Sequence, residues 1–294
     1  MNDAISEADI RIIEDLFAAI PSLPYRHATS DPVWRIWDVV ARDSTARLFA
    51  SPTPSTSVPF GPFGGLILPY VEMGNINSCN LFGLDELILF AFYAANRSRY
   101  RHVVDFGTNI GLHTIILARC GFQVRSFEPD PHHIEILERN LMLNHVHTNL
   151  HRAAVSVASG EMQFTRVLGN TTSSHLSDAK AAPYGELERF TVSAEAAAPH
   201  LAWADLAKID IEGHEGVLVT GLPTTTWLDT DAVLEIGTSD NAHLVFEHLR
   251  GSKINMFAQK IGWRRVISLA EMPTSHREGS LFISAKTEMP WSDD

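Results

Sequence analysis

The first fifty residues carry a helical pattern of apolar and polar positions. Between residues 5 and 20, apolar side chains recur at the spacing of one helical stripe and acids occupy the opposite face, which is typical of an amphipathic helix. A second helix is predicted over residues 32–49, because Asp31 is a favoured N-cap and a proline follows it at the first helical position. Residues 51–62 are rich in Pro, Ser and Thr and predict a linker.

From residue 64 onward, short apolar runs alternate with helical patterns, which predicts a parallel sheet covered by helices on both faces. The predicted strands are residues 66–72, 102–106, 123–127, 149–155, 163–167, 206–211 and 232–236; the predicted helices are residues 84–96, 111–119, 131–144 and 241–250; residues 169–180 predict a loop, and residues 263–268 and 280–285 a closing antiparallel pair. We therefore expect a helical extension and linker at residues 1–63 and one α/β domain at residues 64–294.

Composition narrows the class of protein. Apolar residues make up 45% of the 294-residue chain, which is enough for a sizeable core. The formal net charge of −12 disfavours a nucleic-acid partner, since nonspecific binding to phosphates needs a basic surface. No apolar run is long enough to span a bilayer, no signal peptide is visible, and the two cysteines suggest no disulfide framework. We expect a cytoplasmic protein without a membrane partner.

The sharpest motif is the segment of residues 103–111. An apolar strand ends at Asp105, turns through Gly107, and leads into a helix that begins near Gly111. Glycines let the backbone approach a ligand closely, and a helix N-terminus offers free N–H groups. Asn109 stands where many nucleotide-binding folds have glycine, and asparagine tolerates the left-handed conformation that such a turn needs. Together with Thr108, these residues form the first half of a predicted cofactor site.

The second half is the strand end Glu128-Pro129-Asp130. Glu128 follows Asp105 by 23 residues, close to the spacing at which Rossmann-like folds place an acid on the ribose hydroxyls. A carboxylate can accept two hydrogen bonds from a vicinal diol. The acid at Asp105 would repel the pyrophosphate of NAD but suits the ammonium of a methionine moiety. The pattern therefore favours S-adenosylmethionine as cofactor over a dinucleotide.

A third constellation lies at residues 208–215. Period-two alternation puts Lys208, Asp210 and Glu212 on one side of a strand, and charges on a buried strand are costly unless they are paired or form a site. Ligands of open α/β sheets bind beyond the carboxyl ends of the strands. The candidate catalytic residues are Asp210, Glu212, His214 and, after the next strand, Glu235. For any single one of these residues, the alternative to a catalytic role is a structural ion pair between Lys208 and a carboxylate. A metal bound by Asp210, Glu212 and His214 is a second alternative, although methyl transfer needs no metal and we assign none.

These motifs, in this order, resemble the FkbM-type methyltransferases, which carry VDVGANxGxxT, FEPDP, N-x-x-x-N and KIDVEGxE segments. The corresponding segments here are residues 104–114, 126–131, 140–144 and 208–215, and the resemblance spans residues 103–236. This chain departs from the pattern at Thr108, where alanine is commoner. It departs again at residues 193–195, which read Ser-Ala-Glu in place of Thr-Leu-Asp.

The resemblance implies a Rossmann-like class I methyltransferase fold, with a seven-stranded, mostly parallel sheet and helices on both faces. It also implies S-adenosylmethionine as methyl donor and a hydroxyl of a sugar, polyketide or related natural product as acceptor. Mapped onto this chain, the methionine end would be lined by Asp105, Gly107, Asn109 and Gly111, the ribose held by Glu128, the adenine approached by Asp130, and the reacting centre bordered by Asp210 and Glu212.

The predicted reaction is methyl transfer from S-adenosylmethionine to a hydroxyl of a small molecule, with a carboxylate or histidine as base. Three alternatives stay open: N-methylation of an amine or peptide, a cofactor-binding partner protein without activity, and a nicotinamide dehydrogenase, which the turn disfavours. The apolar stripe of the N-terminal helices, with Trp34 and Trp37 nearby, must be buried against the α/β domain or in a homodimer.

Overall fold

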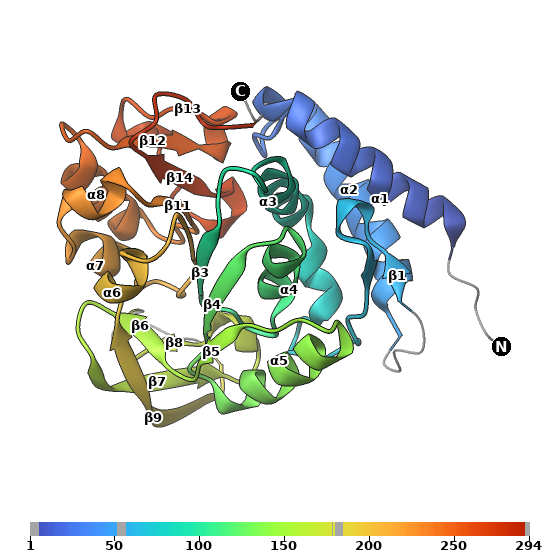
Figure 1. Ribbon diagram of the computed structural model, residues 1–294, viewed down its shortest axis with the longest axis horizontal. Coiled ribbons are helices and arrows are strands. Elements are labelled where there is room, and N and C mark those ends of the chain that lie inside the picture. The colour runs from blue at the N-terminus through green and yellow to red at the C-terminus, as the bar shows by residue number, and fades with distance from the viewer. Residues whose placement is uncertain (1–5, 52–56, 178, 180–184, 292–294) are drawn as a thin grey trace.

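The computed structural model describes residues 6–51, 57–177, 179 and 185–291 (Figure 1). Its main sheet has eight strands in the order β13 (Arg264–Arg265), β12 (Asn255–Ala258), β14 (Leu281–Ser284), β11 (Asp231–Leu234), β10 (Leu206–Ile209), β3 (His102–Phe106), β4 (Gln123–Phe127) and β5 (Asn149–His151). The five strands from β11 to β5 are parallel, and β14 is antiparallel to both of its neighbours. The predicted α/β, mostly parallel, Rossmann-like architecture is confirmed.

Helices cover both faces of the main sheet, as Figure 1 shows. One face carries α3 (Leu84–Ala95), α4 (Leu112–Arg119) and α5 (Pro131–Leu143), and the other carries α6 (Ala198–Leu201), α7 (Glu215–Thr220) and α8 (Ser239–Leu249). Successive residues of a strand point to opposite faces, so Val103 belongs to one apolar core and Val104 to the other. The near-continuous apolar runs of the central strands follow from this burial on both sides.

The N-terminal helices pack on the α3 side of the sheet (Figure 1). They are α1 (Glu7–Ala19) and α2 (Pro32–Phe49), and α2 has the bounds that its N-cap and proline predict. The stripe Ile13, Leu16, Phe17 and Ile20 is buried in the same core as α3. The apolar stripe of α1 is therefore covered within this chain. Residue 5 of the first predicted helix and residues 52–56 of the linker lie outside the described residues.

A second sheet, which we call the inserted sheet, lies between β5 and β10 in the chain and below the main sheet in Figure 1. Its order is β6 (Ala154–Ser156), β9 (Leu187–Ala196), β7 (Gly160–Val167) and β8 (His175–Leu176). The predicted strand 149–155 is thus two strands in two sheets. The predicted loop 169–180 contains β8 and the 3₁₀ helix η5 (Thr171–Ser173), and residues 178 and 180 of it lie outside the described residues.

Three other expectations need correction. The sheet has one strand more than the seven expected, because β13 pairs with β12 at the edge. The predicted closing pair at residues 263–268 and 280–285 does not form, since β13 and β14 flank β12 on opposite sides. The predicted strand 66–72 is reduced to β2 (Gly65–Leu66), paired with β1 (Val58–Pro59). Among the described residues, no helix combines the length and apolar character needed to cross a membrane.

Candidate functional site

Four parallel strands end at the same level of the main sheet. The last residues of β4, β3, β10 and β11 pair with one another across the sheet. The next residues along the chain therefore lie in one row at the carboxyl ends: Glu128, Gly107, Asp210 and Glu235. The sequence predicted all four as site residues, and the strand register brings them together.

These four residues line a cavity of about 1160 Å³. The strand order reverses between β3 and β10, and ligands of open α/β sheets bind outside the carboxyl ends at such a switch point. One wall comes from α2, the 3₁₀ helix η4 (Ser78–Phe82) and α3; the others come from the inserted sheet with η5 and from the 3₁₀ helix η9 (His276–Glu278). The cavity is thus a binding site built by elements that are distant in the sequence.

The glycine turn lies tightly against the next strand. Gly107 has φ +82°, and a Cβ there would lie 1.7 Å from the carbonyl oxygen of Asp210. Asn109 has φ +54°, the left-handed conformation predicted for it. Thr108 closes the turn, because its Oγ1 donates to the carbonyl of Asp105 and accepts from the N–H of Phe127. These contacts connect β3, β4 and β10 at the edge of the cavity.

Gly111 is the N-cap of α4 and has φ +92°. A Cβ at this position would lie 2.3 Å from Cδ1 of Leu137 on α5. Gly111 does not line the cavity itself. It therefore acts by letting α4 begin close to α5, immediately after the turn.

Glu128 is held rigidly at the edge of the cavity. Its Oε2 accepts from the N–H of Asn109 at 2.8 Å and its Oε1 from the N–H of Asp130 at 2.9 Å. Only 5% of Glu128 is exposed, and burial raises the pKa of its carboxyl to about 8 against the two N–H groups that lower it. Each oxygen keeps a lone pair for a ligand. Pro129 also lines the cavity.

Asp130, by contrast, is committed to protein contacts. Its Oδ1 accepts from the N–H of His132 as the N-cap of α5. Arg166 of β7 donates from Nε to Oδ2 at 2.8 Å and makes a second contact through its terminal nitrogen. The side chain is fully buried and does not line the cavity. Asp130 therefore fastens the inserted sheet to α5.

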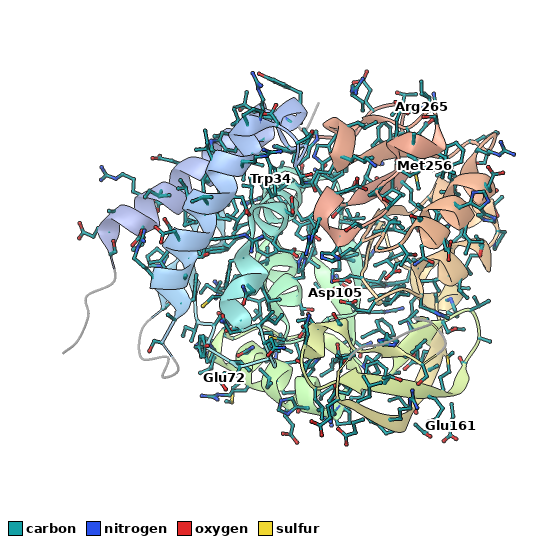
Figure 2. The ribbon with its side chains drawn as sticks, turned by 180° about the vertical axis from the view of Figure 1, so that it is seen from behind. Trp34, Glu72, Asp105, Glu161, Met256 and Arg265 are labelled. Atoms are coloured by element: carbon teal, nitrogen blue, oxygen red, sulfur yellow. The ribbon has the colours of Figure 1, made fainter. Side chains whose placement is uncertain are left out.

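Asp105 lies near the centre of the molecule, as Figure 2 shows. It is fully buried, and its Oδ2 accepts from Thr114 Oγ1 at 2.6 Å. Its Oδ1 lies 3.8 Å from Lys208 Nζ. Asp105 is absent from the cavity wall, so it acts on the site through Lys208.

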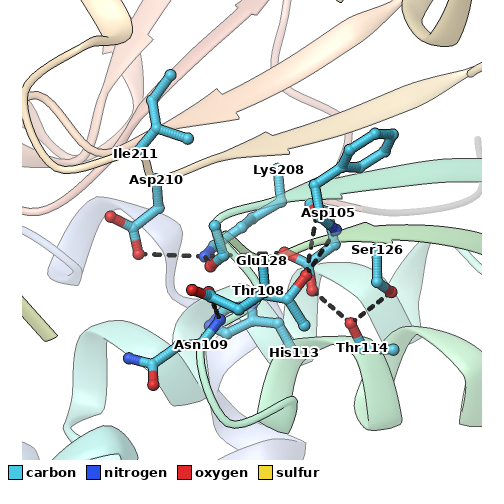
Figure 3. A network of polar contacts seen from close by, with 12 residues as sticks. Asp105, Thr108, Asn109, His113, Thr114, Ser126, Glu128, Lys208, Asp210 and Ile211 are labelled. Carbon is cyan, nitrogen blue, oxygen red and sulfur yellow. Dashed lines mark hydrogen bonds and ion pairs between the residues drawn. The ribbon is translucent and has the colours of Figure 1, made fainter. Parts of the chain in front are cut away.

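Lys208 is the hub of the polar network in Figure 3. Its Nζ lies 3.1 Å from Asp210 Oδ2 and donates to the carbonyl of Gly107 at 3.2 Å. Burial alone would lower its pKa, but the carboxylates of Asp210 and Asp105 outweigh this and raise it. Lys208 therefore stays charged and connects the glycine turn to the strand end at Asp210.

Of the four predicted catalytic residues, Asp210, Glu212 and Glu235 line the cavity. Burial and the neighbouring charges of Asp210 and Glu212 raise the pKa of Glu235 well above its usual range. Glu212 has φ +54°, an unusual conformation for a residue with a side chain. His214 lies outside the cavity wall, and its Nε2 is 3.1 Å from Ser156 Oγ in the inserted sheet.

Glu215, also in the predicted cluster, closes the turn that carries Glu212. Its carboxylate accepts from the N–H groups of Ile211 and Gly213 and from the amide of Asn241. Burial raises its pKa to about 7. Glu215 also lines the cavity, and its hydrogen bonds give it a positioning role for this turn.

Sequence reasoning missed the wall contributed by α3. Asp85 and Glu86, in its first turn, line the cavity. Asp85 Oδ1 accepts from Trp34 Nε1 at 3.0 Å and from Gln259 Nε2 at 2.5 Å, and burial raises its pKa to about 6. The only sequence signal was an Asp-Glu pair at a helix start, which is common because acids complement the helix dipole.

One group of metal-capable side chains clusters within the described residues: His151, Glu195 and His200. It does not include the Asp210, Glu212 and His214 considered from the sequence. Arg125 lies 3.3 Å from His200 Nδ1, and since a guanidinium only donates, that nitrogen must accept. The proton of His200 is then on Nε2, facing Glu195 at 3.1 Å. The trio therefore fits a hydrogen-bonded clasp between β5, β9 and α6 better than a metal site.

The chain matches no protein-family model, and a search of curated proteins finds no match. Among solved structures, it is similar to cofactor-bound Rv0187 from MTB (15% identity, 67% of this chain and 77% of that chain, TM-score 0.37). It is also similar to precorrin-6y C5,15-methyltransferase from Geobacter metallireducens (11% identity, 65% of this chain and 82% of that chain, TM-score 0.33). A third similar structure is tRNA (uracil-54, C5)-methyltransferase from Pyrococcus abyssi, in complex with S-adenosyl-L-homocysteine (14% identity, 79% of this chain and 48% of that chain, TM-score 0.35). These distant likenesses say nothing about what this chain acts on.

Proposed function

We propose that this protein is an S-adenosylmethionine-dependent methyltransferase that methylates a hydroxyl of a small molecule. One observation carries the proposal. The ribose-type carboxylate Glu128, fixed by the backbone of the glycine turn, lines the same cavity as the strand-end carboxylates Asp210 and Glu235. The FkbM resemblance of these segments supports the same function, and natural-product acceptors such as sugars and polyketides fit it.

The donor set fits S-adenosylmethionine better than a dinucleotide. Glu128 can accept both ribose hydroxyls, with Pro129 beside it on the adenine side. Gly107 and Asn109 present backbone to the methionine end. The carboxylates of Asp210 and Glu86 near the turn favour a cation and repel a pyrophosphate. When bound, S-adenosylmethionine supplies a methyl group on a positively charged sulfur, which makes that carbon electrophilic.

The residues of the cavity would bind the acceptor and take up its proton. A hydroxyl is a weak nucleophile until a base removes its proton as the new bond forms. Asp210 Oδ2 is engaged by Lys208, which weakens it as a base. Glu235 lines the cavity, and among the described residues no cation pairs with it. Its raised pKa means that it accepts the proton only in those molecules in which it is already ionised. We therefore assign the proton to Glu235, with Glu212 next.

The walls of the cavity argue for a small acceptor. The inserted sheet, α2 and η9 surround the row of strand ends, and a volume of about 1160 Å³ must hold both the cofactor and the acceptor. The test is transfer of a labelled methyl group from S-adenosylmethionine to a panel of hydroxyl and amine compounds. S-adenosylmethionine at 100 times its Kd should stabilise the purified protein by about 2.7 kcal/mol and so raise its melting temperature. A shift with NAD and none with the methyl donor would overturn the proposal.

An amine acceptor is the second candidate, because the cavity wall is rich in acids. Asp85, Glu86, Asp210, Glu212 and Asp240 all line it, and a cationic amine would find complementary charge there. Labelled methyl on an amine and not on any hydroxyl in the panel would favour this candidate. Binding of the cofactor without transfer to either class would favour a partner protein without activity.

A homodimer through the N-terminal helices also stays a proposal. The stripe on α1 is covered within the chain, so a dimer would use the outer face of α2. Ile36 and Val39 are 63% and 68% exposed there. Sedimentation of the full chain should show a dimer that Ile36→Asp dissociates; a monomer at every concentration would end the proposal.

A further inference from the structure

The cavity contains a carboxylate that the sequence did not single out for the cofactor. Glu86 lines the main cavity and also a recess of about 40 Å³ beside the glycine turn. Gly107, Asn109, His113 and Asp210 line the same recess. A space of this size admits a group about as large as a water or an ammonium.

His113 and Tyr93 hold one oxygen of Glu86. His113 Nε2 lies 2.7 Å from Glu86 Oε2, and the Tyr93 hydroxyl lies 3.2 Å from His113 Nδ1. Burial raises the pKa of Tyr93 well above its usual value, so its hydroxyl keeps its proton. Because an ionised carboxylate only accepts, His113 Nε2 donates to Glu86 Oε2. Within the described residues, no protein group hydrogen-bonds the other oxygen, Oε1.

Glu86 differs from its neighbours in charge. Burial would raise the pKa of its carboxyl, but His113 and Lys208 outweigh burial and the pKa is lowered. Four other cavity carboxyls have raised pKa values: Asp85, Glu128, Glu215 and Glu235. The surroundings of Glu86 thus favour its ionised form, whereas burial shifts the four neighbouring acids toward their neutral forms.

The other carboxylates near the turn are less available to a ligand. Asp105 is fully buried and lines neither the cavity nor the recess, and Asp210 is paired with Lys208. Building on the cofactor site proposed above, we propose that Glu86 binds the α-ammonium of the methionine moiety through Oε1, with His113 and Tyr93 as positioning residues. This moves the ammonium contact from Asp105, where the sequence put it, to a residue of α3.

Calorimetry on the full chain with three probes tests this. The probes are S-adenosylhomocysteine, its analogue without the α-amino group, and 5′-methylthioadenosine, which lacks the amino-acid part. Glu86→Gln should weaken S-adenosylhomocysteine by about tenfold to a hundredfold, as expected for a hydrogen bond to a charged group. Its affinity for the other two probes should stay within about twofold. Glu135→Gln, exposed on α5 and absent from the walls of the cavity and the recess, should change none of the three.

Each outcome has a distinct meaning. If Glu86→Gln weakens all three probes equally, or none, the ammonium contact is elsewhere and the inference is wrong. If Asp210→Asn shows the selective loss instead, the ammonium lies at Asp210. If the wild-type protein binds none of the probes, the proposed cofactor site itself fails. A circular dichroism spectrum equal to wild type shows that a variant has folded.

Discussion

The carboxylate of Asp38 on α2 accepts a hydrogen bond from the backbone N–H of Leu84, which opens α3, at 3.0 Å. The N-cap residue of α3 is Gly83, which has no side chain to do this. The N-terminal extension therefore supplies the cap of the helix that carries Asp85 and Glu86 into the cavity. Trp34 adds a second link from α2 to Asp85, and Figure 2 shows Trp34 between the N-terminal helices and α3.

The first prediction concerns this cap. Asp38→Ala should lower the free energy of unfolding by about 0.5–2 kcal/mol, the usual cost of losing an N-cap. It should also weaken S-adenosylhomocysteine, because the first turn of α3 loses its fixed position. Asp43→Ala is the control, since Asp43 lies on the same helix, is 65% exposed and, among the described residues, pairs with Arg47 alone. Denaturant unfolding and calorimetry measure the two effects; equal behaviour of both variants would contradict the prediction.

The second prediction concerns the glycine turn. Gly107→Ala forces a side chain into φ +82° and against the carbonyl of Asp210. A left-handed backbone costs roughly 1–2 kcal/mol and overpacking about 1–3 kcal/mol, so the variant should be destabilised by about 2–5 kcal/mol. Gly160→Ala is the control, because nothing lies within 4 Å of a Cβ there. Urea denaturation compares them, and a fully stable Gly107→Ala would mean that the turn is looser than described.

The third prediction concerns pH. The pKa of Glu128 is raised from 4.5 to about 8 in the folded chain, so folding favours its neutral form. Its contribution to stability is therefore complete below about pH 4.5 and is lost as the pH rises through 8. Glu128→Gln, which cannot ionise, should gain stability relative to wild type between pH 5 and pH 8.5, on the order of a few kcal/mol.

Melting temperatures of both proteins without ligand, measured across that pH range, check the prediction. Other raised carboxyls titrate in both proteins, so the difference between the two isolates Glu128. Above about pH 8, where Glu128 is ionised, the same variant should bind S-adenosylhomocysteine at least tenfold more weakly, since the amide cannot accept both ribose hydroxyls. A constant difference in melting temperature would show that Glu128 ionises normally.

The fourth prediction concerns the proton acceptor. With an acceptor identified by the labelled-methyl panel, Glu235→Gln should reduce the single-turnover rate by about 10²–10⁴, the usual worth of general-base catalysis. Its affinity for S-adenosylhomocysteine should stay within a few fold. Glu212→Gln and Asp210→Asn should cost less, and His214→Asn least, because His214 is outside the cavity wall. If the single-turnover rates of all four variants stay within threefold of wild type, catalysis is by positioning alone.

The outcome for particular residues shows where sequence reasoning is reliable. Asp31 and Pro32 predicted the start of α2, and the acid at the end of β4 identified Glu128, because both signals are local to the chain. Asp105 and Asp130 were also expected at the ligand. Their side chains are instead committed to Thr114 and Arg166, and nothing near them in the sequence names these partners.

The chain alone determined the strand ends, the glycine turn and the acids that follow them, because helix caps, strand periodicity and turn chemistry act over a few residues. Only the tertiary structure decided which acids face the cavity and which are used as fasteners. It also decided that β9 completes an inserted sheet and that α3 brings Glu86 beside Gly107. Burial and long-range pairing set the charge and orientation of a carboxylate, and both depend on neighbours that are distant in the sequence.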